Sequence, residues 1–373
     1  MENVVSSFKE MPVSINLESD TGVGNLDEIL RLDDDQFHDM ALDQGWSDGL
    51  PVVTPTYQRV SSFIDSINVN PATCVAGIPP ANGKATHEKL IVNAVMAGCM
   101  PQHFPIIKAA VQALVHPDFK LDYTQVTTSP VSTMVVVNGP ITDTCGMNSS
   151  TNALGPGNRA NACIGRALRL ILQNIGGAVP GKVDMATLGQ PLKYTFCFAE
   201  NESASPWGPI AEQFGINRGK DAVTVVPAAG IFEIRDSVSE SASELLQTLA
   251  ESMTPIGIVG PSGKAAIDGV VTIVLAPEHA HILAYGGLNR VQVQEELWQR
   301  AQIDVGRLSE SNRQALGATR KAKGLLSDFN HLPITTSYQN ILLIVAGGAG
   351  RKSCFVPGWG ASLAVTVAVG MES

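Results

Sequence analysis

Short apolar runs, separated by helix-like segments, constrain the fold of this chain more than any other feature. The runs are rich in β-branched residues and have the length of buried strands. They lie at 75–80, 132–138, 193–199, 222–226, 270–275 and 340–345. Strands that alternate with helices predict an α/β fold with mixed or largely parallel sheets and flanking helices.

The segments between these runs show helical patterns that end at Gly, Asn or Pro. The expected helices cover 57–67, 86–99, 105–115, 161–174, 240–253, 278–285 and 290–302. The chain of 373 residues is long enough for two lobes, and a ligand site between the lobes is expected. We expect an N-terminal arm at 1–44 that includes a short acidic helix, a first lobe at 45–180 and a second lobe at 181–373.

The composition excludes some classes of partner. Charged residues make up 16% of the chain and hydrophobic residues 44%, which predicts a large buried core or an oligomer interface, and hence a homo-oligomer. The net charge is -10, with no basic cluster, so nucleic acid is not an expected partner.

The chain carries no sign of export or membrane insertion. Its first residues lack a basic segment followed by an apolar one, and no apolar run approaches the ~18 residues of a membrane span. We therefore expect a cytoplasmic protein. The six cysteines have neither disulfide-framework nor zinc-site spacing, and the scattered histidines predict no metal site.

A Gly/Asn-rich loop before the helix at 161–174 predicts an anion site. Exposed backbone N–H groups meet the side chains of Asn148, Asn158 and Arg159 there, and Arg159 offers a fixed fork for a carboxylate or phosphate. The alternative is a glycine-rich turn whose Arg159 is exposed or tied to a local acid.

A second glycine-rich loop follows the predicted strand at 340–345. It brings Arg351, Lys352 and Ser353 to the carboxyl end of a strand, where α/β proteins bind ligands. The loop differs from a nucleotide-binding P-loop because Arg351 separates Gly350 from Lys352. A tight turn into a following strand is the alternative.

Three glutamates are candidate proton-transfer groups. Glu88 shares a helix face with apolar residues, and burial there would raise its pKa. Glu200 and Glu202 follow the predicted strand at 193–199, and Asn201 and Lys193 share its other face as candidate substrate-binding residues. The alternative for Glu88 is a helix-start acid that complements the helix dipole. No cofactor is expected. A divalent metal ion bound through these carboxylates is an alternative.

One thiol is a candidate nucleophile. Cys145 follows Thr144 in a polar loop, where a reactive cysteine would be accessible. Cys197 lies within the predicted strand at 193–199, where a free cysteine is more often part of the core.

Several stretches of the chain resemble a bacterial family. They include GWSDGLPVVTPT, GMNSSTNALGPGNRANACIGRALRLIL, KYTFCFAENESASPW and VAGGAGRKS, and together they cover most of the sequence after residue 45. The family comprises proteins of similar length encoded beside, or fused to, small selenoproteins with a selenocysteine-Gly-Ser-Cys motif. The resemblance implies a small-molecule enzyme with a small thiol or selenol protein as partner, although this chain lacks the motif itself.

These observations predict a lyase or hydrolase, without a nucleotide cofactor, that cleaves a carbon–heteroatom bond in a small carboxylate-bearing substrate. The substrate would lie between the loops at 152–159 and 347–353, with a glutamate transferring the proton. Two alternatives remain. One is the substrate-binding subunit of a thiol- or selenol-dependent reductive system, and the other is a non-catalytic binding protein.

Overall fold

Several helices of the computed structural model begin where a side chain caps free backbone N–H groups. Thr56, Thr86 and Asn158 each accept a hydrogen bond from the first turn of the helix that follows. The structure describes residues 34–260, 262–326 and 329–370. The α-helices are α3 (Asp34–Asp43), α4 (Tyr57–Ile67), α5 (His87–Met96), α6 (Phe104–Leu114), α7 (Leu121–Val126), α8 (Ile141–Thr144), α9 (Arg159–Asn174), α10 (Ala242–Ser252), α11 (Pro277–Tyr285), α12 (Arg290–Arg300) and α13 (Glu310–Ala322).

Short 3₁₀ helices and strands complete the described elements. The 3₁₀ helices are η1 (Pro101–His103), η2 (Pro117–Phe119), η3 (Pro191–Lys193), η4 (Glu202–Ala204), η5 (Ile210–Phe214), η6 (Ile256–Ile258), η7 (Val305–Arg307) and η8 (Tyr338–Asn340). The strands are β1 (Cys74–Ile78), β2 (Gly83–Thr86), β3 (Ser132–Asn138), β4 (Cys197–Ala199), β5 (Ala222–Ala228), β6 (Phe232–Arg235), β7 (Val271–Leu275), β8 (Gln302–Asp304), β9 (His331–Pro333), β10 (Ile341–Val345), β11 (Lys352–Val356) and β12 (Val365–Ala368).

The longer strands form two mixed sheets. The first has the order β12-β5-β3-β4, in which β3 and β4 are parallel and the other pairs are antiparallel. The second has the order β10-β7-β11-β6, in which β10 and β7 are parallel. The α/β class, with mixed sheets and flanking helices, is therefore confirmed.

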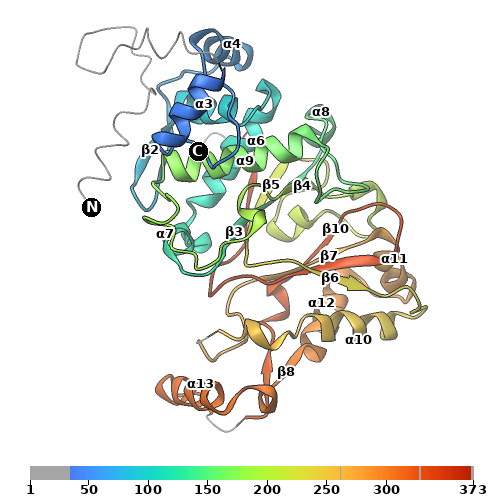
Figure 1. Cartoon of the computed structure of the whole chain (residues 1–373). Helices are drawn as coiled ribbons and strands as arrows, with labels where there is room; N and C mark the ends of the chain where they lie inside the picture. The colour runs from blue at the N-terminus through green and yellow to red at the C-terminus, as the bar shows by residue number, and fades with distance from the viewer. Residues whose placement is uncertain (1–33, 261, 327–328, 371–373) are drawn as a thin grey trace.

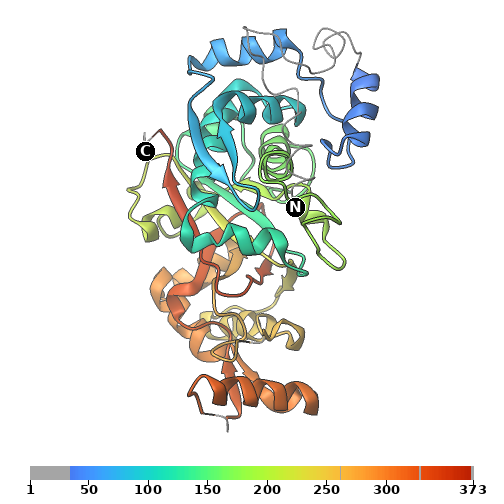
Figure 2. The same ribbon diagram turned by 90° about the vertical axis from the view of Figure 1, so that its left-hand side faces the viewer.

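The two sheets pack against each other through a shared apolar layer. Alternate side chains of a strand point to opposite faces, so Met134 and Val136 enter this layer while Val135 and Val137 face the helices. β7 and β10 alternate in the same way. Helices α6 and α9 cover the outer face of the first sheet, and α10 and α12 cover that of the second (Figure 1). Helix α5 packs on α9 and α6, and Figure 2 shows the two layers from the side.

The carboxyl ends of strands from both sheets lie together. Asn201, just after β4, donates its backbone N–H to the carbonyl of Val345 at the end of β10, at 2.7 Å. The next loop also connects the sheets, because the N–H of Gly347 donates to Ser149 at 2.9 Å. The stacked sheets thus bring together loops that are far apart in sequence.

Some predicted elements have different bounds in the structure. The strand expected at 193–199 is confined to Cys197–Ala199, because Pro191 opens the 3₁₀ helix η3 instead. The helix expected at 86–99 ends at Met96, since Gly98 has a φ of +84° that a right-handed helix cannot accommodate.

The sheets do not follow the predicted division of the chain at residue 180. β4, β5 and β12 all come after this point, yet they join β3 in the first sheet. Residues 1–33 of the predicted arm lie outside the described residues. The short acidic helix expected within the arm is α3.

The part of the chain that the structure describes contains no helix with the length and apolar character needed to cross a bilayer.

Candidate active site

Helix α9 places three polar side chains on one side. Arg166, Arg169 and Gln173 are spaced three and four residues apart, so they lie along one helix face. Asn158 caps the helix by accepting a hydrogen bond from the backbone of Asn161 at 2.9 Å. Arg169 and Gln173 are both buried, which requires polar partners for each.

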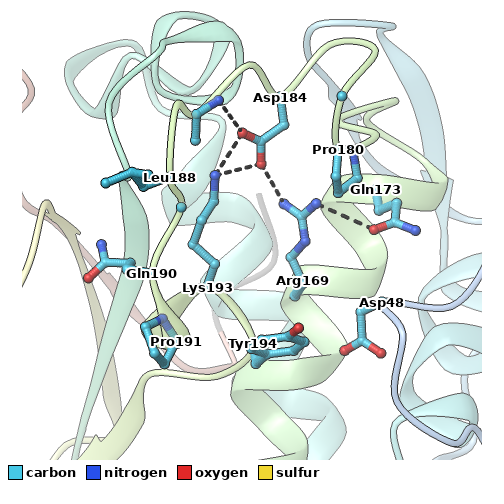
Figure 3. A pocket seen from close by; sticks show the side chains of 13 residues that line it. Asp48, Arg169, Gln173, Pro180, Asp184, Leu188, Gln190, Pro191, Lys193 and Tyr194 are labelled. Carbon is cyan, nitrogen blue, oxygen red and sulfur yellow. Dashed lines mark hydrogen bonds and ion pairs between the residues drawn. The ribbon is translucent and has the colours of Figure 1, made fainter.

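A pocket of about 480 Å³ lies beside this helix face (Figure 3). Its wall combines α9 with the loop around residue 48 and the segment that leads into β4. The lining residues are Asp48, Arg169, Gln173, Pro180, Gly181, Asp184, Ala186, Leu188, Gly189, Gln190, Pro191, Lys193 and Tyr194.

The carboxylate of Asp184 binds two cations in this pocket. Lys193 donates from Nζ to both carboxylate oxygens, at 2.7 and 2.6 Å, and the guanidinium of Arg169 is 3.5 Å from Oδ2. The backbone N–H of Ala186 also donates to Asp184, at 3.3 Å. Figure 3 shows Lys193 and Arg169 reaching this carboxylate from different sides.

Gln173 connects Arg169 to the loop at 45–51. Its Nε2 donates to the carbonyls of Gly45 and Ser47, at 2.8 Å each, and its Oε1 accepts from Arg169 at 3.3 Å. Backbone carbonyls accept hydrogen bonds, so only the NH₂ group of Gln173 can bind the carbonyls of Gly45 and Ser47. The amide oxygen of Gln173 must therefore face Arg169. The guanidinium also donates to the carbonyl of Ala178 at 2.9 Å, which holds it in place.

Asp48 is already neutralised by Arg166. The two side chains form a bidentate ion pair at 2.8 and 2.9 Å, and the Asp48 side chain is only 3% exposed. With Asp48 paired in this way, Arg169 and Lys193 outnumber Asp184 by one positive charge.

Burial lowers the pKa of both pocket cations. It lowers the pKa of Lys193, and the charge of Arg169 lowers it further, whereas the hydrogen bonds to Asp184 act in the opposite direction. Burial also lowers the pKa of Arg169, and the charge of Asp184 opposes this shift. The arrangement can bind an anion, and it can exchange a proton between an amine and a carboxylate.

The acidic loop expected to supply proton transfer is largely closed off by protein. Glu200 has a fully buried side chain and accepts from Asn138 and from the backbone of Ile210, both at 2.7 Å. It also lies 3.4 Å from Arg290, and burial raises its pKa. A ligand could reach Glu200 only if this loop moved.

The neighbours of Glu200 also bind protein groups. Glu202 is half-buried and accepts from the backbone of Gly139 at 2.8 Å. Asn201 is buried and donates to the carbonyl of Gly347 at 3.2 Å. Glu200, Asn201 and Glu202 therefore lie together, as expected, but they contact loops of the protein.

The two glycine-rich loops contact each other without bringing their arginines together. A Cβ on Gly348 would lie 2.0 Å from the hydroxyl of Thr151, which shows how closely the loops pack. Arg159, however, is exposed and donates from Nε to the carbonyl of Gly98 at 3.0 Å. Asn148 and Asn158 bind backbone carbonyls of their own loop.

The basic residues of the C-terminal loop point to different surroundings. Arg351 donates to Glu240 at 3.0 Å and borders another pocket, of about 580 Å³, with His281 and Tyr285. Lys352 is exposed on β11. Ser353 is buried, and its Oγ lies 2.7 Å from His279 Nδ1. We expected Arg351, Lys352 and Ser353 to surround one ligand together with Arg159. The structure instead gives each of them different neighbours.

Cys145 and Glu88 differ from their expected surroundings. Cys145 is buried after α8 rather than accessible in a loop, its thiol donates to the carbonyl of Gln102 at 3.0 Å, and burial raises its pKa to about 11. Glu88 is half-buried in the first turn of α5, the position of the dipole-complementing acid.

Within residues 34–260, 262–326 and 329–370, no three His, Cys, Asp or Glu side chains are grouped so that they could hold a metal ion.

Lys193 is the side chain that both the sequence and the pocket select. The sequence analysis missed Asp48, Arg169, Gln173 and Asp184. A signal was present in RALRLILQN, where polar residues recur every three to four positions on an otherwise apolar helix. Asp184 had no comparable signal, because its loop shows no periodic pattern.

Comparison with known proteins gives no family assignment. No protein-family model matches the chain. No curated protein matches it either.

Proposed function

We propose that this chain is an enzyme that binds a small carboxylate-bearing substrate in the pocket beside α9. The observation that carries the proposal is the sharing of one carboxylate, Asp184, by two cations, the buried Arg169 and the half-buried Lys193. A substrate carboxylate would balance the remaining positive charge, and the planar guanidinium of Arg169 suits such a ligand.

The proposed reaction is the cleavage of a carbon–heteroatom bond by a lyase or hydrolase. Both reaction classes need a group that moves a proton near the breaking bond. The pair formed by Lys193 and Asp184 supports this role, because the amine and the carboxylate are in direct contact at the pocket wall. Glu200 is less suited, since protein groups surround its carboxylate.

We also propose that the protein acts in the cytoplasm and as a homo-oligomer. Leu188, Val238 and Tyr285 have exposed fractions of 95%, 83% and 86%, so self-association at these positions would bury apolar surface. Light scattering on the purified chain tests the oligomer, and a monomer at micromolar concentration would contradict it.

The enzyme proposal is tested by turnover of a panel of small carboxylic acids that carry a carbon–heteroatom bond. Arg169→Met should raise KM about tenfold or more on any acid that reacts, because it removes a charge-assisted contact to the substrate. Arg169→Lys retains the positive charge and tests whether the planar guanidinium is needed to bind the carboxylate. Arg218→Met, a change in a surface ion pair whose arginine side chain is 65% exposed, is the matched control and should leave KM unchanged.

Two outcomes would count against this proposal. A variant at Arg169 with unchanged KM would show that the pocket does not bind the substrate carboxylate. Turnover that appears only when a small thiol or selenol protein is added would favour a substrate-binding subunit of a reductive system. In that case the reactive chalcogen would come from the partner.

A further inference from the structure

We propose that Lys193 is a nucleophile that forms an imine with a small oxo-carboxylate, whose carboxylate group binds Arg169. This inference rests on the proposed function, because it assumes that the pocket binds a carboxylate. It goes further by naming a covalent step and by narrowing the substrate to acids that also carry a ketone or aldehyde.

The position of the amine supports this role. Lys193 ends the 3₁₀ helix η3, and Pro191 at the first position of that helix restricts the backbone leading to it. The Lys193 side chain is only 16% exposed and reaches into the pocket wall (Figure 3). Among the described residues, its Nζ has no hydrogen-bond acceptor other than Asp184, so one N–H position remains for a substrate.

The pKa of Lys193 is lowered on balance, which increases the share of its neutral, nucleophilic form, although the hydrogen bonds to Asp184 act in the opposite direction. Burial and the nearby positive charge of Arg169 lower the pKa of Lys193, the two influences that activate catalytic lysines in general. Asp184 can take up the proton that the ammonium releases, because both of its oxygens are within 2.7 Å of Nζ.

The covalent step balances with the groups present. The amine lone pair forms a C–N bond to the carbonyl carbon, while the C=O π electrons move to the oxygen, which takes the proton that the nitrogen then releases. The resulting carbinolamine then loses its hydroxyl group as water, with the proton supplied by Asp184, and a C=N bond remains. No oxidant or reductant is required.

The imine also accounts for carbon–heteroatom cleavage. A protonated imine withdraws electrons from the adjacent carbon, which can then lose a proton to Asp184. The electron pair from that C–H bond forms a C=C bond, and the heteroatom group on the next carbon leaves with its own bonding pair and takes the proton from Asp184. Water then adds to the C=N bond and releases the unsaturated oxo acid and the free amine. Arg169 would hold the carboxylate during both steps and so keep the carbonyl near Nζ.

Reductive trapping tests the proposal directly. The full-length chain is incubated with pyruvate, acetoacetate or levulinate, which carry the carbonyl at increasing distances from the carboxylate, and sodium borohydride is then added. We expect at least one acid to modify Lys193, with a mass gain equal to that of the acid less one oxygen atom. Peptide mass spectrometry locates the modification.

Two lysine variants serve as controls. Lys193→Arg keeps a positive charge beside Asp184 but cannot form the imine, so it should lose the modification. Lys182→Arg changes an exposed lysine near the same pocket. In this variant Lys193 should be modified to the same extent as in the unaltered chain. Arg169→Met should lower the yield of adduct at a given acid concentration about tenfold.

The outcomes separate this inference from the proposed function. If the three acids raise the thermal unfolding midpoint but none modifies Lys193, the imine is overturned and carboxylate binding stands. If the acids neither raise the midpoint nor modify Lys193, both proposals are overturned. Equal modification of Lys182 and Lys193 would also overturn the imine, since it would show unselective chemistry.

Discussion

The carboxylate of Asp184 lies between Arg169 and Lys193, and the three side chains are 8%, 9% and 16% exposed. Charges with so little access to water are tolerated only when they are paired, because their desolvation is costly. The stability of this region and the binding capacity of the pocket therefore depend on the same carboxylate.

Asp184→Asn should destabilise the folded chain. The change leaves Arg169 and Lys193 close together without a counterion, which should lower the free energy of unfolding by about 3 kcal/mol. Urea denaturation measures the effect. Asp65→Asn, at an exposed position, is the control and should change the stability little. An equally small effect at Asp184 would mean that one of the two cations is neutral in the folded protein.

Cys145 should react slowly with alkylating agents. Burial raises its pKa to about 11, and its thiol donates a hydrogen bond to the carbonyl of Gln102. At pH 8 iodoacetamide should modify the exposed Cys74 well before Cys145, and mass spectrometry can follow both peptides. Equal rates at the two positions in the folded protein would revive Cys145 as a candidate nucleophile.

At the level of elements, helix α9 connects the pocket to the loop at 45–51. Gln173 holds this loop through the carbonyls of Gly45 and Ser47, and Asn174 holds it through the carbonyl of Trp46 at 2.9 Å. Arg166 adds the ion pair to Asp48. Helix α9 therefore carries Arg169 and also holds the loop at 45–51, which forms part of the pocket wall.

Gly165 allows α9 to pack closely on the segment that enters β4. A Cβ at this position would lie 2.3 Å from the hydroxyl of Thr195 and 3.0 Å from the backbone nitrogen of Phe196. Gly165→Ala should therefore lower the free energy of unfolding by about 1–3 kcal/mol, despite the better helix propensity of alanine.

Thermal or urea unfolding measures this change. Gly257→Ala is the control, because no atom lies within 4 Å of the Cβ that it would add. A Gly165 variant as stable as the Gly257 variant would show that the helix shifts outward at little cost.

For the whole molecule, the buried pair of Glu200 and Arg290 connects the two sheet layers. Glu200 follows β4 in the first sheet, and Arg290 begins α12, which packs on β10 of the second. The guanidinium also donates to the carbonyl of Pro209 at 3.0 Å. These contacts join the layers beside the apolar core that they share.

The contribution of Glu200 to stability should depend on pH. Burial raises its folded pKa above the ordinary value of 4.5, so the folded chain holds this proton more tightly than the unfolded chain does. The associated stability is fully present below pH 4.5 and is lost as the pH rises through the raised pKa.

Glu200→Gln provides the measurement. The difference in unfolding free energy between the unaltered chain and this variant should be largest below pH 4.5 and should shrink as the pH rises. Glu251→Gln, at an exposed position, controls for general effects of charge. A difference that grows with pH would show that pairing with Arg290 outweighs burial.

Local pattern was sufficient to predict most of the longer helices and the buried strands, although the 13-residue helix α13 was missed. The strand at 132–138 has the predicted bounds, and the helix at 57–67 does too, because apolar periodicity and the Thr56 cap act within a few residues. The strand predicted at 193–199 was wrong in part, because Pro191 begins a 3₁₀ helix where extended backbone was expected. β12 was missed; it is short, and it is stabilised by pairing with β5.

The sequence by itself determined the α/β class, the main buried strands and the presence of Lys193 near a polar segment. Only the tertiary structure decided which residues share a pocket. Arg169 lies on α9 and Asp184 in the loop that follows this helix, and their contact with Lys193 depends on how α9 packs beside the segment before β4. Buried charges select their partners through space because each needs a counterion out of water, and no local pattern in a single sequence records that pairing.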